Sequence, residues 1–171
     1  FYTMVKKILG YGLMIILIFF VLIVTIPSTV SPSVTKEVKA SPLEVQKALS
    51  DIQNFRLWDP KIVSDSTVSY NFYTENNIQC MQVTDSLSNI IATYKVEKSD
   101  PSEVQISVDI SEVDILLYSF KLTQTESGTK ITWSMDFEIN LMMYMLGAEN
   151  KLEIMFSEGL NSFQKTLMNN L

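Results

Sequence analysis

The sequence predicts an α+β fold in which a seven-stranded antiparallel sheet wraps around one long C-terminal helix. From residue 62 to residue 141, apolar and polar residues alternate in short segments separated by turn residues. This is the pattern of half-buried strands joined by hairpins. From about residue 146 to residue 170, apolar residues recur every three or four positions, which indicates a helix. A twisted sheet with one apolar face can bury that face against such a helix.

The chain before residue 62 predicts a strand followed by two helices. Residues Val34 to Lys39 alternate apolar and polar side chains, as a strand does. Ser41 then stands at a helix N-cap, Pro42 at the first helical position, and Glu44 in the first turn, where the helix dipole favours a negative charge. A second, broken helix is expected from Asp51 to Pro60.

Six further strands complete the predicted sheet. Turn residues such as Glu75-Asn76-Asn77 and Glu126-Ser127-Gly128 separate them. The hairpin spacing makes consecutive strands neighbours in the sheet, so we expect an antiparallel meander. The expected strands cover residues 62–74, 78–84, 90–96, 104–110, 116–122 and 131–141.

The run Leu141–Leu146 lies at the junction between the last strand and the C-terminal helix. It contains six consecutive large apolar residues, more than one face of a strand or helix can bury. Four interpretations fit this run: a cavity mouth, a membrane-touching patch, a surface for a protein partner, or a strand end that continues directly into a core helix.

Two motifs resemble the START/Bet v 1-like superfamily, also known as SRPBCC or polyketide cyclase-like proteins. The first is Ala40-Ser41-Pro42-Leu43-Glu44-Val45, followed by Asp51 and Trp58-Asp59-Pro60, with Phe55 where the family has another tryptophan. The second, Phe156 to Phe163 (FSEGLNSF), resembles the family's Phe, two residues, Gly-Leu signature in its last helix.

This resemblance covers about residues 34–170 and implies the helix-grip fold. In that family the sheet and the last helix enclose an apolar cavity, which often holds lipids, sterols, polyketides or other hydrophobic molecules. The same apolar residues would equally fill a closed core, and periodicity does not separate the two arrangements. The candidate cavity-lining residues are Tyr94, Ile106, Val108, Tyr118, Phe120, Trp133, Met135, Phe137, Met155 and Phe156.

Composition excludes several classes of site. The 171 residues carry a formal net charge of −6, which disfavours binding to nucleic acid. The chain has no histidine, so a Ser-His-Asp triad and histidine-ligated metals are excluded. Its one cysteine, Cys80, is expected to pack as a small apolar residue. We therefore expect no metal and no cofactor.

Catalytic residues are not predicted. The acidic residues Asp109, Asp136 and Glu138 alternate with apolar neighbours, so their side chains are expected to face solvent. A non-catalytic protein is the leading hypothesis, and a cyclase- or hydrolase-like enzyme is retained as a less favoured one.

The N-terminal run Ile8–Ile26 contains 19 residues without charge, long enough for a transmembrane helix. Lys6 and Lys7 precede it, so the positive-inside rule predicts a cytoplasmic N-terminus and a domain on the outer side, periplasmic if the chain is bacterial. A cleaved signal peptide is the rival interpretation, disfavoured because no small-residue cleavage site follows.

Three segments are therefore expected: an anchor over residues 1–26, a Pro/Ser linker over 27–33, and the helix-grip domain over 34–171. The leading hypothesis is a membrane-anchored, extracytoplasmic binding protein for a hydrophobic small molecule or lipid. The alternative is an accessory or structural subunit of a larger membrane protein complex, in which the domain docks to membrane-protein partners.

Overall fold

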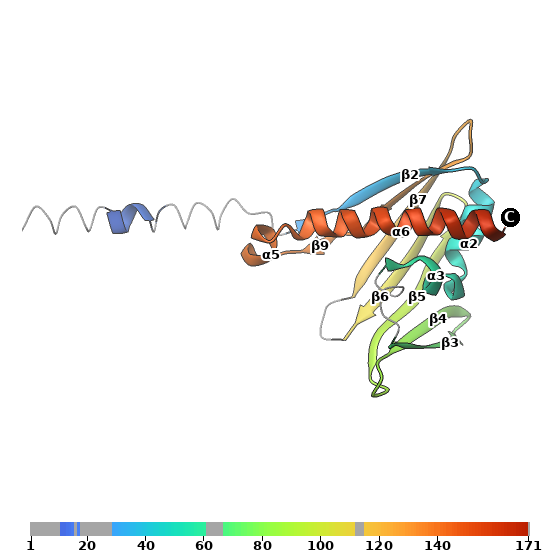
Figure 1. The fold of residues 1–171 in the computed structure, drawn as a ribbon, viewed down its shortest axis with the longest axis horizontal. Helices are drawn as coiled ribbons and strands as arrows, with labels where there is room; N and C mark the ends of the chain where they lie inside the picture. The colour runs from blue at the N-terminus through green and yellow to red at the C-terminus, as the bar shows by residue number, and fades with distance from the viewer. Residues whose placement is uncertain (1–10, 16, 18–28, 61–66, 112–114, 171) are drawn as a thin grey trace, which may run out of the picture.

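A computed structural model describes residues 11–15, 17, 29–60, 67–111 and 115–170 (Figure 1). Its centre is a seven-stranded antiparallel sheet in the order β2-β8-β7-β6-β5-β4-β3. This confirms the predicted sheet and its meander, which runs from β3 to β8 with β2 added beside β8. The strands are β2 (Ser33–Val38), β3 (Ser69–Glu75), β4 (Ile78–Thr84), β5 (Ile90–Asp100), β6 (Glu103–Ile110), β7 (Leu116–Gln124) and β8 (Thr129–Ser134).

The helices lie on one side of this sheet, as the helix-grip fold requires (Figure 1). The longest, α6 (Ala148–Asn170), contacts β2 and the short helix α3 (Phe55–Trp58). Helix α2 (Pro42–Ser50) packs on β5, β6 and β7, and the 3-10 helix η1 (Ile52–Asn54) links it to α3. The long C-terminal helix and the helix pair near residue 50 were both predicted.

The start of α2 follows from local sequence. The Glu44 amide donates to Ser41 Oγ at 3.3 Å, and the Ser41 amide donates to Glu44 Oε2 at 2.7 Å. This capping box satisfies two amide groups that a helix end otherwise leaves unpaired. At the other end, Asp51 Oδ1 accepts from the Gln53 amide at 3.1 Å. The chain therefore turns from α2 towards α3 within a few residues.

A cluster of aromatic rings joins the sheet to α6. Trp133 on β8 stacks on Phe156 of α6 with ring centroids 4.3 Å apart, and its neighbour across the sheet is Phe120 of β7. Trp58 on α3 meets Phe163 of α6 at 5.3 Å. All five side chains are buried, so the core lies between the sheet and the helices.

The last predicted strand, 131–141, differs from the structure. Strand β8 ends at Ser134, and a separate strand β9 (Phe137–Glu138) pairs with β1 (Thr29–Val30) in a small second sheet. The segment expected to be a linker, 27–33, thus contains β1 and the first residue of β2. Val30 is buried in this arrangement, a tertiary contact that the Pro/Ser composition does not reveal.

The run Leu141–Leu146 also differs from the expected strand end. Residues Leu141–Met145 form a helix, α5, which Gly147 separates from α6. Gly147 has φ of +66°, a left-handed conformation that ends a helix and that glycine adopts at little cost. The predicted helix from residue 146 therefore begins at Ala148 instead.

The predicted localisation is contradicted. Within the described parts of the chain, no helix is both long and apolar enough to cross a membrane. Most of Ile8–Ile26, on which that prediction was based, lies outside the described residues. The structure thus does not support a single-pass anchor with an outer domain.

Candidate functional site

The ten residues predicted to line a cavity lie in the core. Three pairs of them are neighbours across strands: Tyr94 with Val108, Ile106 with Tyr118, and Phe120 with Trp133. Those six are buried, as are Met135 and Phe156, while Phe137 and Met155 are half-buried and pack against the same cluster. Their role as ligand contacts stays a prediction.

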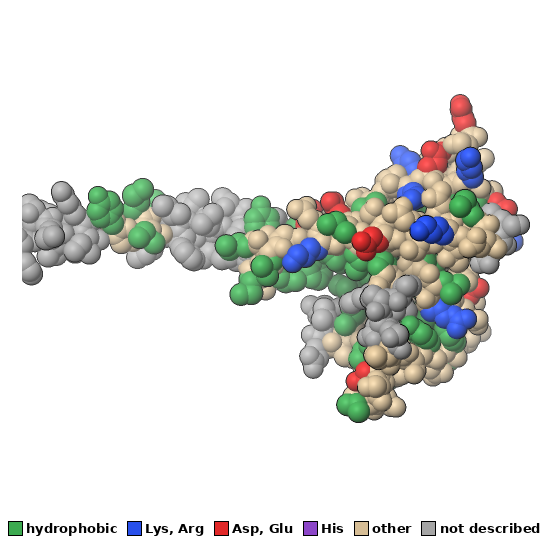
Figure 2. Space-filling view, in the orientation of Figure 1, with side chains coloured by type: hydrophobic (Ala, Val, Ile, Leu, Met, Phe, Trp, Pro, Cys, Tyr) green, Lys and Arg blue, Asp and Glu red, His purple; other side chains and the backbone are tan. Residues whose placement is uncertain are grey.

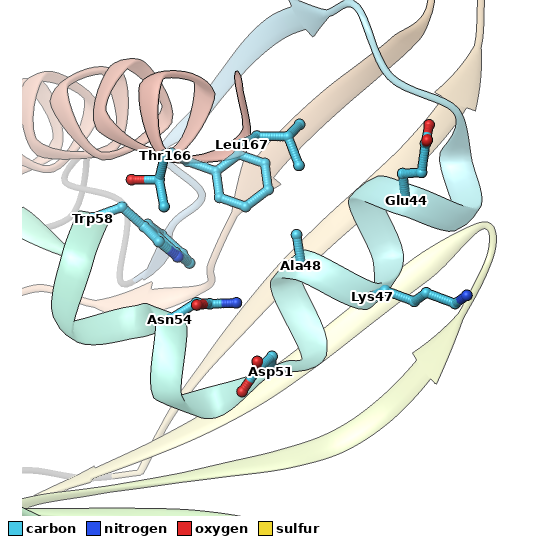
Figure 3. A pocket seen from close by; sticks show the side chains of 9 residues that line it. Glu44, Lys47, Ala48, Asp51, Asn54, Trp58, Thr166 and Leu167 are labelled. Atoms are coloured by element: carbon cyan, nitrogen blue, oxygen red, sulfur yellow. The ribbon is translucent and has the colours of Figure 1, made fainter. Parts of the chain in front are cut away.

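A pocket of about 300 Å³ opens elsewhere, between α2, α3 and the C-terminal part of α6 (Figure 3). Helix geometry assembles it, because residues three or four apart share a helix face. Sequence reasoning missed this site, since its walls come from segments more than one hundred positions apart. The lining residues are Glu44, Lys47, Ala48, Asp51, Asn54, Trp58, Phe163, Thr166 and Leu167.

The floor of the pocket is apolar and continuous with the core. Trp58, Phe163 and Leu167 are all buried. The Trp58 ring also contacts Phe55 at 4.4 Å and Trp133 at 5.7 Å between ring centroids. Any molecule in the pocket would therefore rest on apolar side chains that are themselves packed into the core.

Trp58 carries a buried hydrogen-bond donor, the indole Nε1. Its indole Nε1 finds no hydrogen-bond acceptor among the described residues. A buried tryptophan N–H usually has a partner, and leaving it unpaired costs about 1–3 kcal/mol. In Figure 3 the nitrogen of Trp58 faces the space between α2 and α6. Trp133 Nε1 likewise has no acceptor in the described part of the chain, but Trp133 does not line this pocket.

The rim of the pocket is polar, and several of its groups are already engaged. Glu44 caps α2, and the hydrogen bonds from Ser41 lower the pKa of its carboxyl group. Asp51 binds the Gln53 amide, and Thr166 Oγ1 donates to the Ser162 carbonyl at 3.1 Å. Within the described structure, the side chains of Lys47 and Asn54 make no hydrogen bond. These two remain available to a ligand.

A buried polar group lies deeper in the core. Asp59, which follows α3, is only 1% exposed. Burial raises the pKa of the Tyr118 hydroxyl, and the nearby Asp59 carboxylate raises it further. The pKa of Tyr94 rises for the same two reasons, burial first. Both tyrosines are therefore neutral wherever the protein is folded near neutral pH.

These raised pKa values predict a loss of stability at alkaline pH. In an unfolded chain, tyrosine ionises at a pKa of about 10. Above that pH the unfolded chain binds fewer protons than the folded one, so the free energy of unfolding falls as pH rises. Urea denaturation at increasing pH will show a shallower fall for Tyr118→Phe than for the wild type. The exposed Tyr144→Phe is the control, and an equal slope in both variants would contradict the prediction.

Comparisons with solved structures agree with the fold. A Staphylococcus aureus protein of unknown function is 11% identical, with a TM-score of 0.64 over 83% of this chain and 95% of that chain. An uncharacterised Bacillus thuringiensis protein is 16% identical, with a TM-score of 0.57 over 81% and 99%. Ara h 8.0201 is 14% identical, with a TM-score of 0.55 over 82% and 99%. At these identities the likeness shows the fold alone.

Sequence comparison supplies the family. Among curated proteins, none matches this chain. The profile of one family, described as polyketide cyclase / dehydrase and lipid transport, matches residues 29–167, which is most of the chain. This agrees with the resemblance carried by the motifs around Trp58 and Phe156. The chain therefore belongs to the polyketide cyclase / dehydrase and lipid transport family.

Proposed function

We propose that this protein binds a hydrophobic small molecule, without transforming it, in the pocket between α2, α3 and α6. The observation that carries the proposal is the buried Trp58 at the pocket floor, whose indole N–H has no acceptor among the described residues. Apolar walls with a few convergent polar groups are typical of small-molecule sites. The family, whose description includes lipid transport, suggests the same kind of ligand.

Filling the pocket tests this proposal. Ala48 is half-buried in the pocket wall, so Ala48→Leu places a larger side chain where a ligand would lie. We expect the wild type to bind propiophenone, a small aromatic ketone, and Ala48→Leu to bind it at least about tenfold more weakly, because steric overlap removes the apolar contacts. Isothermal titration calorimetry measures both affinities.

Ala148→Leu is the matched control, because Ala148 is a half-buried helical alanine that does not line this pocket. It should bind as the wild type does. Equal affinities in wild type and Ala48→Leu would place the ligand elsewhere in the molecule. Absence of binding by the wild type would overturn the proposed function.

A second candidate function, docking to another protein, rests on α5. Four large apolar side chains on and just after this helix are between 50% and 77% exposed: Met142, Tyr144, Met145 and Leu146. Figure 2 shows hydrophobic side chains gathered over this helix. Exposed apolar patches of this kind mark interaction surfaces. A purified partner that binds the wild type and not Met145→Glu, while propiophenone binding is retained, would favour this function.

A further inference from the structure

We infer that the pocket between α2, α3 and α6 selects a small, uncharged molecule that carries a hydrogen-bond acceptor, such as a ketone or a lactone, and that Trp58 Nε1 is the donor that recognises it. This inference rests on the proposed function and names the ligand class for that same pocket. Three properties of the pocket lead to this inference: its volume, the chemistry of the Trp58 donor, and the charges at its rim.

The volume limits the size of the ligand. A space of about 300 Å³ equals the liquid volume of about ten water molecules at roughly 30 Å³ each, so it suits a molecule with on the order of ten non-hydrogen atoms. The floor residues Trp58, Phe163 and Leu167 are packed into the core, so the pocket does not deepen without unpacking that core. A sterol or a two-chain lipid is larger than this space. The pocket therefore suits a compact molecule, such as one aromatic ring with a short side chain.

The unpaired donor requires an acceptor on the ligand. An indole N–H donates and never accepts, so a hydroxyl, carbonyl or ester oxygen satisfies it and a hydrocarbon does not. Trp58 lines the pocket and its Nε1 is buried, so an acceptor oxygen pairs with this donor only when the ligand displaces the side chains that cover it. Because the donor is buried, water does not pair with it when a hydrocarbon occupies the pocket. A ligand with an acceptor oxygen therefore binds more tightly than a hydrocarbon of the same size.

The rim disfavours an anionic ligand. The carboxylates of Glu44 and Asp51 flank the single ammonium group of Lys47, so the rim carries more negative than positive charge. A carboxylate or phosphate head group would meet this excess of negative charge, which the one ammonium group of Lys47 offsets only in part. A cationic ligand is favoured by the rim, but an ammonium group has no lone pair for the Trp58 N–H. An uncharged acceptor fits both constraints.

Four probes of one size separate these properties: propiophenone, n-propylbenzene, 3-phenylpropanoate and 3-phenylpropylammonium. Each has a phenyl ring and three further carbons, and they differ in acceptor and charge. We expect propiophenone to bind about tenfold more tightly than n-propylbenzene, because only the ketone pairs with the buried donor. The two charged probes should bind more weakly than the ketone.

Nuclear magnetic resonance identifies the donor directly. The chain has two tryptophans, so a ¹⁵N-labelled sample gives two indole N–H signals, and Trp58→Phe assigns them. Propiophenone should move the Trp58 indole proton downfield, the direction of a new hydrogen bond, while n-propylbenzene should not. In a folded Trp58→Phe variant, the preference for ketone over hydrocarbon should disappear, because phenylalanine keeps an apolar ring without the donor.

The wild-type signals test the inference even if Trp58→Phe does not fold. Equal affinities for ketone and hydrocarbon, with no shift of the indole proton, would overturn the inference and leave the proposed function in place. Tightest binding of either charged probe would also overturn it. If no probe binds, both the inference and the proposed function are wrong.

Discussion

Replacing Trp133 by alanine is expected to lower the free energy of unfolding by about 3–5 kcal/mol, the largest single effect that we predict. Trp133 is fully buried and lies within 6 Å of four aromatic rings, stacked on Phe156 and at 5.0 Å from Phe120. Alanine removes the ring and leaves a cavity that the surrounding sheet and helix cannot fill. Urea denaturation followed by far-ultraviolet circular dichroism measures the loss.

Trp133→Phe is the matched comparison. Phenylalanine keeps a ring against Phe156 and removes an indole N–H that has no acceptor within the described structure. Because no hydrogen bond is lost, we expect this variant to lose less than half as much stability as Trp133→Ala. Equal losses in the two variants would show that ring stacking in this cluster contributes little.

Replacing Gly159 by alanine is expected to lower the free energy of unfolding by about 1–3 kcal/mol. A Cβ at this position of α6 would lie 2.6 Å from Trp133 Cζ3 and 3.1 Å from Pro60 Cδ. Trp133 cannot move away, since other rings surround it. In an unobstructed helix, alanine is instead more stable than glycine by about 1 kcal/mol. Calorimetric melting of the two proteins measures the change, and an unchanged or raised Tm would contradict the prediction.

Two further variants isolate the contact with Trp133. Gly12→Ala is the control, because a Cβ there meets no atom within 4 Å. It should not lower stability. The double variant Gly159→Ala with Trp133→Phe should lose less than the sum of the single losses, since the smaller ring makes room for the new methyl group. An additive result would place the overlap at Pro60 instead.

The helix start and the strands were predictable because they depend on nearest neighbours in the chain. Ser41 and Glu44 cap α2 through bonds three residues apart. Alternation in β6 places Val104, Ile106 and Val108 on the buried face. Helix α5 was not predicted, because Leu141–Leu146 is apolar at every position and shows no helical period. Periodicity also does not record the positive φ of Gly147.

The sequence by itself determined the antiparallel meander, the long helix that packs against it and the family, because apolar periodicity and two short motifs carry that information. Only the tertiary structure decided where a pocket opens. The predicted candidates, such as Tyr118 and Trp133, are packed against each other in the core, and their role as ligand contacts stays a prediction. The pocket beside Trp58 was not predicted. The physical reason is that a cavity is space left where side chains from distant segments, here Ala48 and Leu167, do not meet. No local pattern of residues encodes that space.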